Sequence, residues 1–178
     1  MAGPIIIIGI DPGSRVAGYG LVRLGAHSDP EYVEHGVLAL PADAPLPVRL
    51  VSLKTQLQNV LNRFNPAVAV IENIFMGKNA DSAFKLGHAR GVCMAEAAGV
   101  GCEIVEYATR QVKKGVTGNG GATKEQVGML VSASLKISRS KVLPEDATDA
   151  LALAYYHALS MQVAMKMRGR GKERGLTT

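Results

Sequence analysis

The sequence has no tryptophan, and only 4% of its residues are aromatic, so its core must be built from aliphatic side chains. Its two cysteines, Cys93 and Cys102, lie in apolar surroundings, which excludes a disulfide framework and predicts a protein of the reducing cytoplasm. No apolar run reaches the roughly 20 residues of a membrane span. The first ten residues lack the charged and long apolar regions of a signal peptide, so we expect neither an anchor nor a leader.

Positive charge is concentrated in the second half of the chain. Residues 1–89 contain seven Lys and Arg and seven Asp and Glu, whereas residues 90–178 contain thirteen and eight, which gives the net charge of +5. This asymmetry suggests an anionic partner, although a solvated basic surface has the same composition. Basic residues also dominate the segment 166–174, which we expect to be disordered. We therefore predict one domain, residues 1–165, and a basic tail, residues 166–178.

The chain is organised around its first predicted strand, residues 5–10, which contains five isoleucines and one glycine. An apolar run without polar alternation indicates a strand that is covered on both faces of a sheet. The strand ends at Asp11, and Pro12 and Gly13 then force a turn. An aspartate at the tip of a central strand is well placed to bind a metal ion, although it can equally cap the turn.

The segments that follow predict an α/β sheet. Residues 17–24 and 31–40 are expected strands, and two glycines in the first of them allow close approach by another element. Apolar spacing predicts a helix over 46–64, and residues 67–71 form a second buried strand, which ends at Glu72. Parallel strands joined by a helix would place Asp11 and Glu72 at one edge of the sheet, where ligands bind. Alternatively, Glu72 is a surface residue just past a strand.

The second half of the chain adds a loop at 73–79 with large apolar residues, which are either anchored in the core or exposed for a partner. A helix over 80–98 has small residues on one face, which suits tight helix–helix contact, including contact between subunits. A strand is expected at 102–106 and a short helix at 108–114. The glycine-rich segment 115–121 is expected to be flexible.

The last predicted helix begins near Pro144 and carries Asp146 and Asp149 on one face of its first turn. Acids at this position often only cap the helix and interact with its dipole. Together with Asp11 and Glu72, however, they would form a cluster of four carboxylates that requires compensating cations. Such oxygen ligands favour Mg²⁺ or Mn²⁺, and two ions about 4 Å apart can hydrolyse a phosphodiester.

Four segments resemble, in the same order, the RuvC family of crossover-junction endodeoxyribonucleases. They are GIDPGSRVAGYG (9–20), IENIFMGKNADSAFKLGHARG (71–91), ATRQVKKGVTGNGGATKEQV (108–127) and DATDALALA (146–154). The resemblance implies a ribonuclease-H-like α/β fold, with a mixed five-stranded sheet flanked by helices. It also implies a homodimer that resolves Holliday junctions, in recombination and repair, by paired symmetric nicks. Mg²⁺ is the implied cofactor, with Mn²⁺ as a substitute and two ions per site, and the RuvA–RuvB branch-migration complex is the implied partner.

The resemblance also assigns roles to residues. Asp11, Glu72, Asp146 and Asp149 correspond to the catalytic, metal-binding carboxylates, which are the four that the reasoning from the residues selects. Phe75 corresponds to an aromatic residue that stacks on bases at the junction centre, and Lys78 lies beside it. Lys113 and Lys124 correspond to residues that contact phosphates, although a solvated face would also explain them. The helix over 80–98 corresponds to the region that forms the dimer.

Two other functions are compatible with parts of this pattern. An actin- or hexokinase-like ATPase also uses an aspartate and a glycine turn after its first strand, but it needs two lobes and a much longer chain. A catalytically silent module that binds junctions would share the fold and the basic charge, but it would not require four carboxylates. A metal titration of cleavage separates this module from a nuclease.

Overall fold

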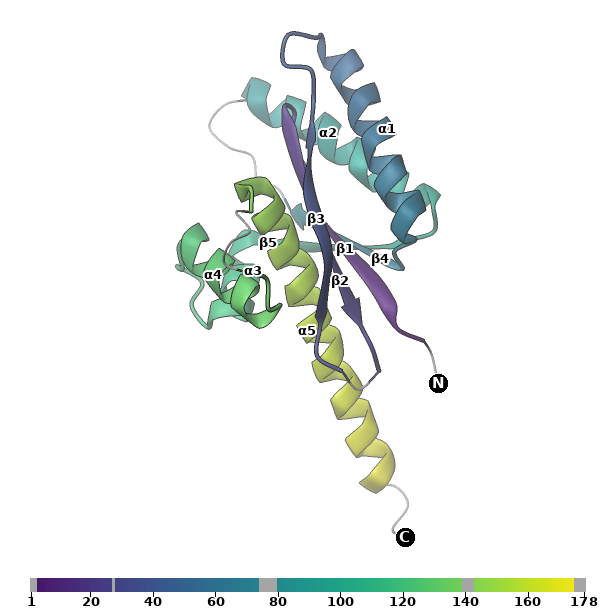
Figure 1. The fold of residues 1–178 in the computed structure, drawn as a ribbon, viewed down its shortest axis with the longest axis vertical. Helices are drawn as coiled ribbons and strands as arrows, with labels where there is room; N and C mark the ends of the chain where they lie inside the picture. The colour runs from purple at the N-terminus through teal and green to yellow at the C-terminus, as the bar shows by residue number, and fades with distance from the viewer. Residues whose placement is uncertain (1–2, 27, 74–79, 139–142, 175–178) are drawn as a thin grey trace.

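The computed structural model describes residues 3–26, 28–73, 80–138 and 143–174, with 168–174 described by their backbone alone. Its centre is a five-stranded sheet in the order β3-β2-β1-β4-β5 (Figure 1). The strands are β1 (Ile5–Asp11), β2 (Val16–Leu24), β3 (Glu31–Ala39), β4 (Val68–Asn73) and β5 (Glu103–Ala108). The pairs β1–β2 and β2–β3 are antiparallel, whereas β1–β4 and β4–β5 are parallel. The prediction of a mixed five-stranded sheet is therefore confirmed.

The central strand β1 is buried on both faces. Ile8 and Ile10 pack into the core beneath helices α1 (Leu46–Phe64) and α2 (Ala80–Gly99), whereas Ile7 packs into the core on the opposite face. All three side chains are fully buried. Because successive side chains of a strand point to opposite faces, the isoleucine run supplies both cores, which explains why it lacks polar residues.

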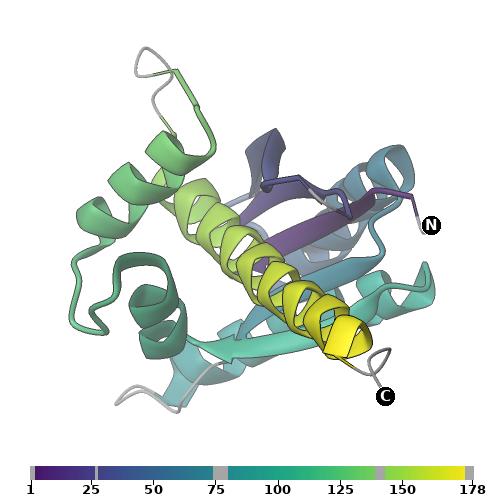
Figure 2. The same cartoon turned by 90° about the horizontal axis from the view of Figure 1, so that it is seen from below.

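The other face of the sheet is covered by α3 (Thr109–Thr117), α4 (Lys124–Ser134) and α5 (Glu145–Arg174). Figure 2 shows α5 crossing this face of the sheet, with α3 and α4 beside its first half. Buried residues of α5, among them Leu151 and Ala154, meet Val127 and Val131 of α4 in this second core. The start of α5 is thereby fixed between the sheet and α4.

Two segments that the sequence predicts to be irregular are helical in the structure. Helix α5 continues to Arg174, so residues 166–174 are not a disordered coil. Nucleation is the costly step of helix formation, so an existing helix extends through methionine, lysine and arginine even where Gly169 and Gly171 disfavour it. Helix α3 includes residues 115–117, because Gly115 lies directly against the ring of Tyr156, where a Cβ atom would overlap it.

Neither cysteine forms a disulfide bond. Cys93 and Cys102 are both buried free thiols, and burial raises the pKa of Cys93 to about 12. Within the described ranges, no helix combines the length and the apolar character that crossing a membrane requires.

Candidate active site

Asp11 and Glu72 end two adjacent parallel strands. β1 and β4 pair through Ile10 and Ile71, so the next residue of each strand is an acid at the carboxyl edge of the sheet. This confirms the prediction that the two acids share an edge. The turn that follows Asp11 is held from α1, since Nη1 of Arg49 donates a hydrogen bond to the Ser14 carbonyl oxygen at 2.8 Å.

Three glycines allow the first turns of α5 to lie directly on the sheet. A Cβ atom at Gly9 would overlap the carbonyl oxygen of Ala150, and one at Gly18 would overlap that of Asp146. At Gly20 the added atom would lie 2.5 Å from the Cα atom of Leu151. Real Cβ atoms do not tolerate such contacts with backbone, so these positions must be glycine for α5 to pack this closely.

This packing brings the charges of four carboxylates together. The pKa of Asp11 is raised to about 7, first by burial and then by the negative charges of Glu72, Asp149 and Asp146, while Lys124 opposes the shift. Mutual repulsion of this kind makes a site that binds either protons or cations. Perturbed carboxylates at the ligand-binding edge of an α/β sheet are typical of functional sites.

A cavity of about 160 Å³ opens at this edge. It is lined by charged and polar side chains from the strand ends and from three helices, and by an apolar wall. The lining residues are Asp11, Glu72, Thr109, Lys113, Lys124 and Asp149, with Val112, Val127, Ala152 and Leu153 forming the wall. Asp146 does not line the cavity, although its charge acts on Asp11.

Two of the three lysines that the sequence selects, Lys113 and Lys124, lie at this cavity. The Lys124 ammonium donates to Oδ2 of Asp149 at 2.6 Å and to Oε1 of Glu145 at 2.7 Å, and these bonds raise its pKa. Lys113 lines the cavity from α3. The remaining two predicted DNA contacts, Phe75 and Lys78, lie outside the described residues.

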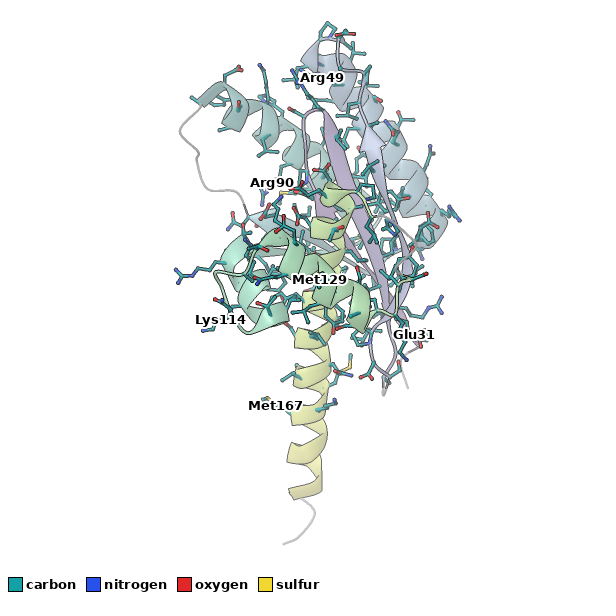
Figure 3. The ribbon with its side chains drawn as sticks, turned by 60° about the vertical axis from the view of Figure 1, so that its left-hand side comes forward. Glu31, Arg49, Arg90, Lys114, Met129 and Met167 are labelled. Carbon is teal, nitrogen blue, oxygen red and sulfur yellow. The ribbon has the colours of Figure 1, made fainter. Side chains whose placement is uncertain are left out.

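The structure adds residues that the sequence reasoning does not identify. The Thr109 hydroxyl donates a hydrogen bond to Oε1 of Glu72. Arg90, labelled in Figure 3, donates from Nε to the Glu72 carbonyl oxygen at 3.1 Å and forms an ion pair with Glu106 of β5. The position of Thr109 in the sequence does point to the site, because this residue follows a strand that ends at the same edge of the sheet as Glu72.

The donor set suits a hard divalent cation. In the described part of the chain, no three Asp, Glu, His or Cys side chains are arranged around a single metal position. Mg²⁺ does not need such a cage, since it keeps several waters and usually binds one or two carboxylates together with substrate phosphates. A cation bound there would relieve the repulsion that Glu72, Asp149 and Asp146 add to burial in raising the Asp11 pKa. The residues therefore fit a magnesium site.

If Glu72 binds the metal, replacing Thr109 with Val should reduce cleavage about tenfold, because groups that orient a metal ligand typically contribute ten- to a hundredfold to metal affinity or activity. The lost hydrogen bond frees the Glu72 carboxylate to rotate, so the metal concentration at half-maximal rate should rise. Thr55→Val is the matched control, since the Thr55 hydroxyl bonds only to a carbonyl of its own helix. If both variants cleave like the unmodified protein, Thr109 does not position Glu72.

The stability of the metal-free protein should decrease as the pH rises from about 4 to 7. The Asp11 carboxyl has an ordinary pKa of 3.8 when the chain is unfolded and a pKa of about 7 when it is folded, so the folded protein binds the proton more tightly across this window. The stabilisation is fully present below the unfolded pKa and is lost as the pH rises through the folded one. Thermal unfolding in EDTA from pH 4.5 to 8 measures it, and Asp11→Asn should flatten this part of the profile.

Carboxylates lie at the tip of the central strand of the mixed sheet and at the start of the helix that crosses it. This arrangement defines a ribonuclease-H-like enzyme with an acidic site. The family model described as "Crossover junction endodeoxyribonuclease RuvC" matches residues 7–157. The chain therefore belongs to the RuvC family of crossover junction endodeoxyribonucleases, and the expectation of a nuclease is confirmed.

Individual relatives agree with this assignment. The RuvC crossover junction endodeoxyribonuclease of Bdellovibrio bacteriovorus is 50% identical over 158 residues, which cover 89% of this chain and 92% of the relative. That of Chromohalobacter salexigens is 43% identical, with coverages of 95% and 89%. Among solved structures, Thermus thermophilus RuvC in complex with a Holliday junction substrate matches with a TM-score of 0.82 and 28% identity, covering 90% of this chain and 97% of that one. The expected ribonuclease-H-like fold is thus confirmed.

Proposed function

We propose that this protein resolves Holliday junctions by metal-dependent hydrolysis of phosphodiester bonds at the cavity beside Asp11. The observation that carries the proposal is the convergence of Glu72, Asp146 and Asp149 on Asp11, whose pKa is raised by burial and by their charges. Two lysines at the same cavity add positive charge where a phosphate would enter. The Thermus thermophilus relative bound to a Holliday junction substrate supports four-way DNA as the substrate.

In this proposal Asp11, Glu72, Asp146 and Asp149 hold two Mg²⁺ ions, for which Mn²⁺ can substitute. When bound, the ions supply a water nucleophile and stabilise the charge that develops on the phosphate oxygens. Lys113 and Lys124 contribute the positive charge that attracts and orients the phosphate.

Paired nicks require two active sites, and α2 offers a surface for a homodimer. One face of α2 packs into the core through Ala89, Cys93 and Ala97. The other face exposes Phe84, and added Cβ atoms at its glycines, Gly87 and Gly91, would meet open space. A partner helix can approach such a face closely. The dimer would place two cavities on one junction, and Phe75 and Lys78, which precede α2 in the sequence, are the proposed contacts to its DNA.

The function is tested by incubating the protein with a synthetic four-way junction and with a linear duplex of the same sequence, in Mg²⁺ and in EDTA. We expect symmetric nicks in two junction strands, no cutting of the duplex, and no cutting in EDTA. Equal cutting of both substrates would contradict junction selectivity. Tight junction binding without cutting in Mg²⁺ or Mn²⁺ would contradict the metal site and favour a silent binding module.

A cellular role in recombination and repair follows from this activity. It places the protein with the chromosome in the cytoplasm, which suits its two free thiols. The RuvA–RuvB complex is the proposed partner that moves the junction before it is cut. Cleavage of a mobile junction with and without RuvA–RuvB tests this partnership.

A further inference from the structure

We infer that the Lys124 ammonium and the catalytic metal compete for Asp149, so that Lys124 acts as a built-in counter-cation which must leave before the site is loaded. The inference rests on the proposed function, because it takes Asp149 as a metal ligand. The inference goes beyond the proposed function by assigning Lys124 a role before the substrate is cut, and by giving Glu145 a role in holding this lysine.

The first observation is the geometry of the ammonium group. It lies 2.6 Å from one Asp149 oxygen and 2.7 Å from one Glu145 oxygen, so it bridges two carboxylates at the start of α5. These are the distances of strong charge-assisted hydrogen bonds. A divalent ion bound to the same Asp149 oxygen would face a positive charge at contact distance. The Lys124 ammonium and a divalent metal ion therefore cannot bind the same Asp149 oxygen at the same time.

The second observation is the placement of Lys124 itself. It is the first residue of α4, after the cap residue Thr123, whose side chain and that of Gln126 form a reciprocal capping box. A cation is unfavourable at a helix N-terminus, because the helix dipole is positive there. Helix stability thus does not explain a lysine at this position, whereas its two carboxylate partners on α5 do.

The third observation is that the exchange does not require unfolding. The Lys124 side chain is 52% exposed and that of Glu145 is 70% exposed, whereas Asp149 is only 27% exposed. The ammonium can therefore move toward solvent while Glu145, which is not one of the four proposed ligands, still accepts its hydrogen bond. A DNA phosphate at the cavity is an alternative acceptor for the same ammonium, so DNA should help to free Asp149.

The experiment measures binding of Ca²⁺, used as an oxygen-preferring probe metal, by calorimetry on the protein without DNA. We expect Lys124→Gln to bind Ca²⁺ about tenfold more tightly than the unmodified protein, within the range typical of coupled sites. Lys113→Gln is the matched control, because it removes the same charge from the same cavity. It should change the affinity by less than about threefold, since no bond of Lys113 to Asp149 has to be broken.

A second measurement needs no variant. In protein with ¹⁵N-labelled lysine, an ammonium held by two carboxylates should give a resolved Nζ signal in EDTA. Adding Ca²⁺ should remove this signal, and so should adding a short single-stranded oligonucleotide in EDTA. A resolved signal that survives saturating Ca²⁺ would overturn the competition.

The calorimetric results distinguish failure of the competition between lysine and metal from failure of the proposed metal site. Equal tightening in Lys124→Gln and Lys113→Gln would overturn the inference alone, because it would indicate general repulsion in place of competition at Asp149. If neither the unmodified protein nor Lys124→Gln binds Ca²⁺, the proposed metal site itself fails and the inference fails with it.

Discussion

Asp11→Asn is expected to abolish cleavage of four-way junctions and, at the same time, to stabilise the metal-free protein. Loss of a carboxylate that is proposed to bind the metal should lower the cleavage rate at least about a thousandfold, which corresponds to about 4 kcal/mol of transition-state stabilisation. The same change removes a partly buried charge that three neighbouring carboxylates repel. Above pH 7 the free energy of unfolding should therefore rise by roughly 1–4 kcal/mol.

Both effects can be measured on one preparation. Junction cleavage is followed in Mg²⁺, junction binding in EDTA, and thermal unfolding in EDTA at pH 8. Binding should persist, because Asn keeps the shape of Asp and removes only negative charge. Asp43→Asn is the control, since Asp43 is exposed in the segment before α1. Retained cleavage in Asp11→Asn would remove Asp11 from the catalytic site, and unchanged stability would contradict the repulsion.

Gly18→Ala is expected to reduce both stability and activity, although Gly18 carries no functional group. The added Cβ atom would overlap the Asp146 carbonyl oxygen and lie 2.8 Å from the Ala147 nitrogen, so the first turn of α5 must move away from the sheet. Overpacking of this kind typically costs about 1–3 kcal/mol. Cleavage should fall by about a hundredfold or more, because catalytic groups misplaced by about 1 Å lose roughly that factor.

The comparison that isolates this effect is Gly99→Ala at the end of α2, where an added Cβ atom meets nothing within 4 Å. It should leave the unfolding free energy nearly unchanged or slightly higher, because alanine favours the helix. Cleavage and urea unfolding are measured for both variants. If Gly18→Ala cleaves normally while folding normally, the close contact between α5 and β2 does not position the carboxylates.

The strand-end acids could be predicted from the sequence because their positions follow from local patterns. A buried isoleucine run that stops at Asp11, and a second apolar run that stops at Glu72, fix both ends without reference to the rest of the fold. The parallel connection through α1 then sets their common edge. For 115–117 and 166–174, glycine content and charge predict irregular chain, whereas the structure is helical there, through packing on Tyr156 and continuation of α5.

The partners of these acids depend on the assembled fold. The hydrogen bond from Thr109 to Glu72 spans 37 residues, and the ion pair from Lys124 to Asp149 spans 25. Contacts between residues so far apart in the sequence depend on how α3, α4 and α5 pack against the sheet, and no local sequence pattern encodes this packing.

Local patterns in the chain suffice to identify the carboxylates and the order of the elements that carry them, because burial and periodicity act over short segments. The packing of remote segments, in contrast, sets α5 on glycine backbone, close enough for the charges of its acids to add to burial and to Glu72 in raising the Asp11 pKa to about 7. The same packing lets Lys124 bridge Asp149 and Glu145. Charge interactions and close contacts depend on distances through space, and these distances arise when segments far apart in the chain are folded together.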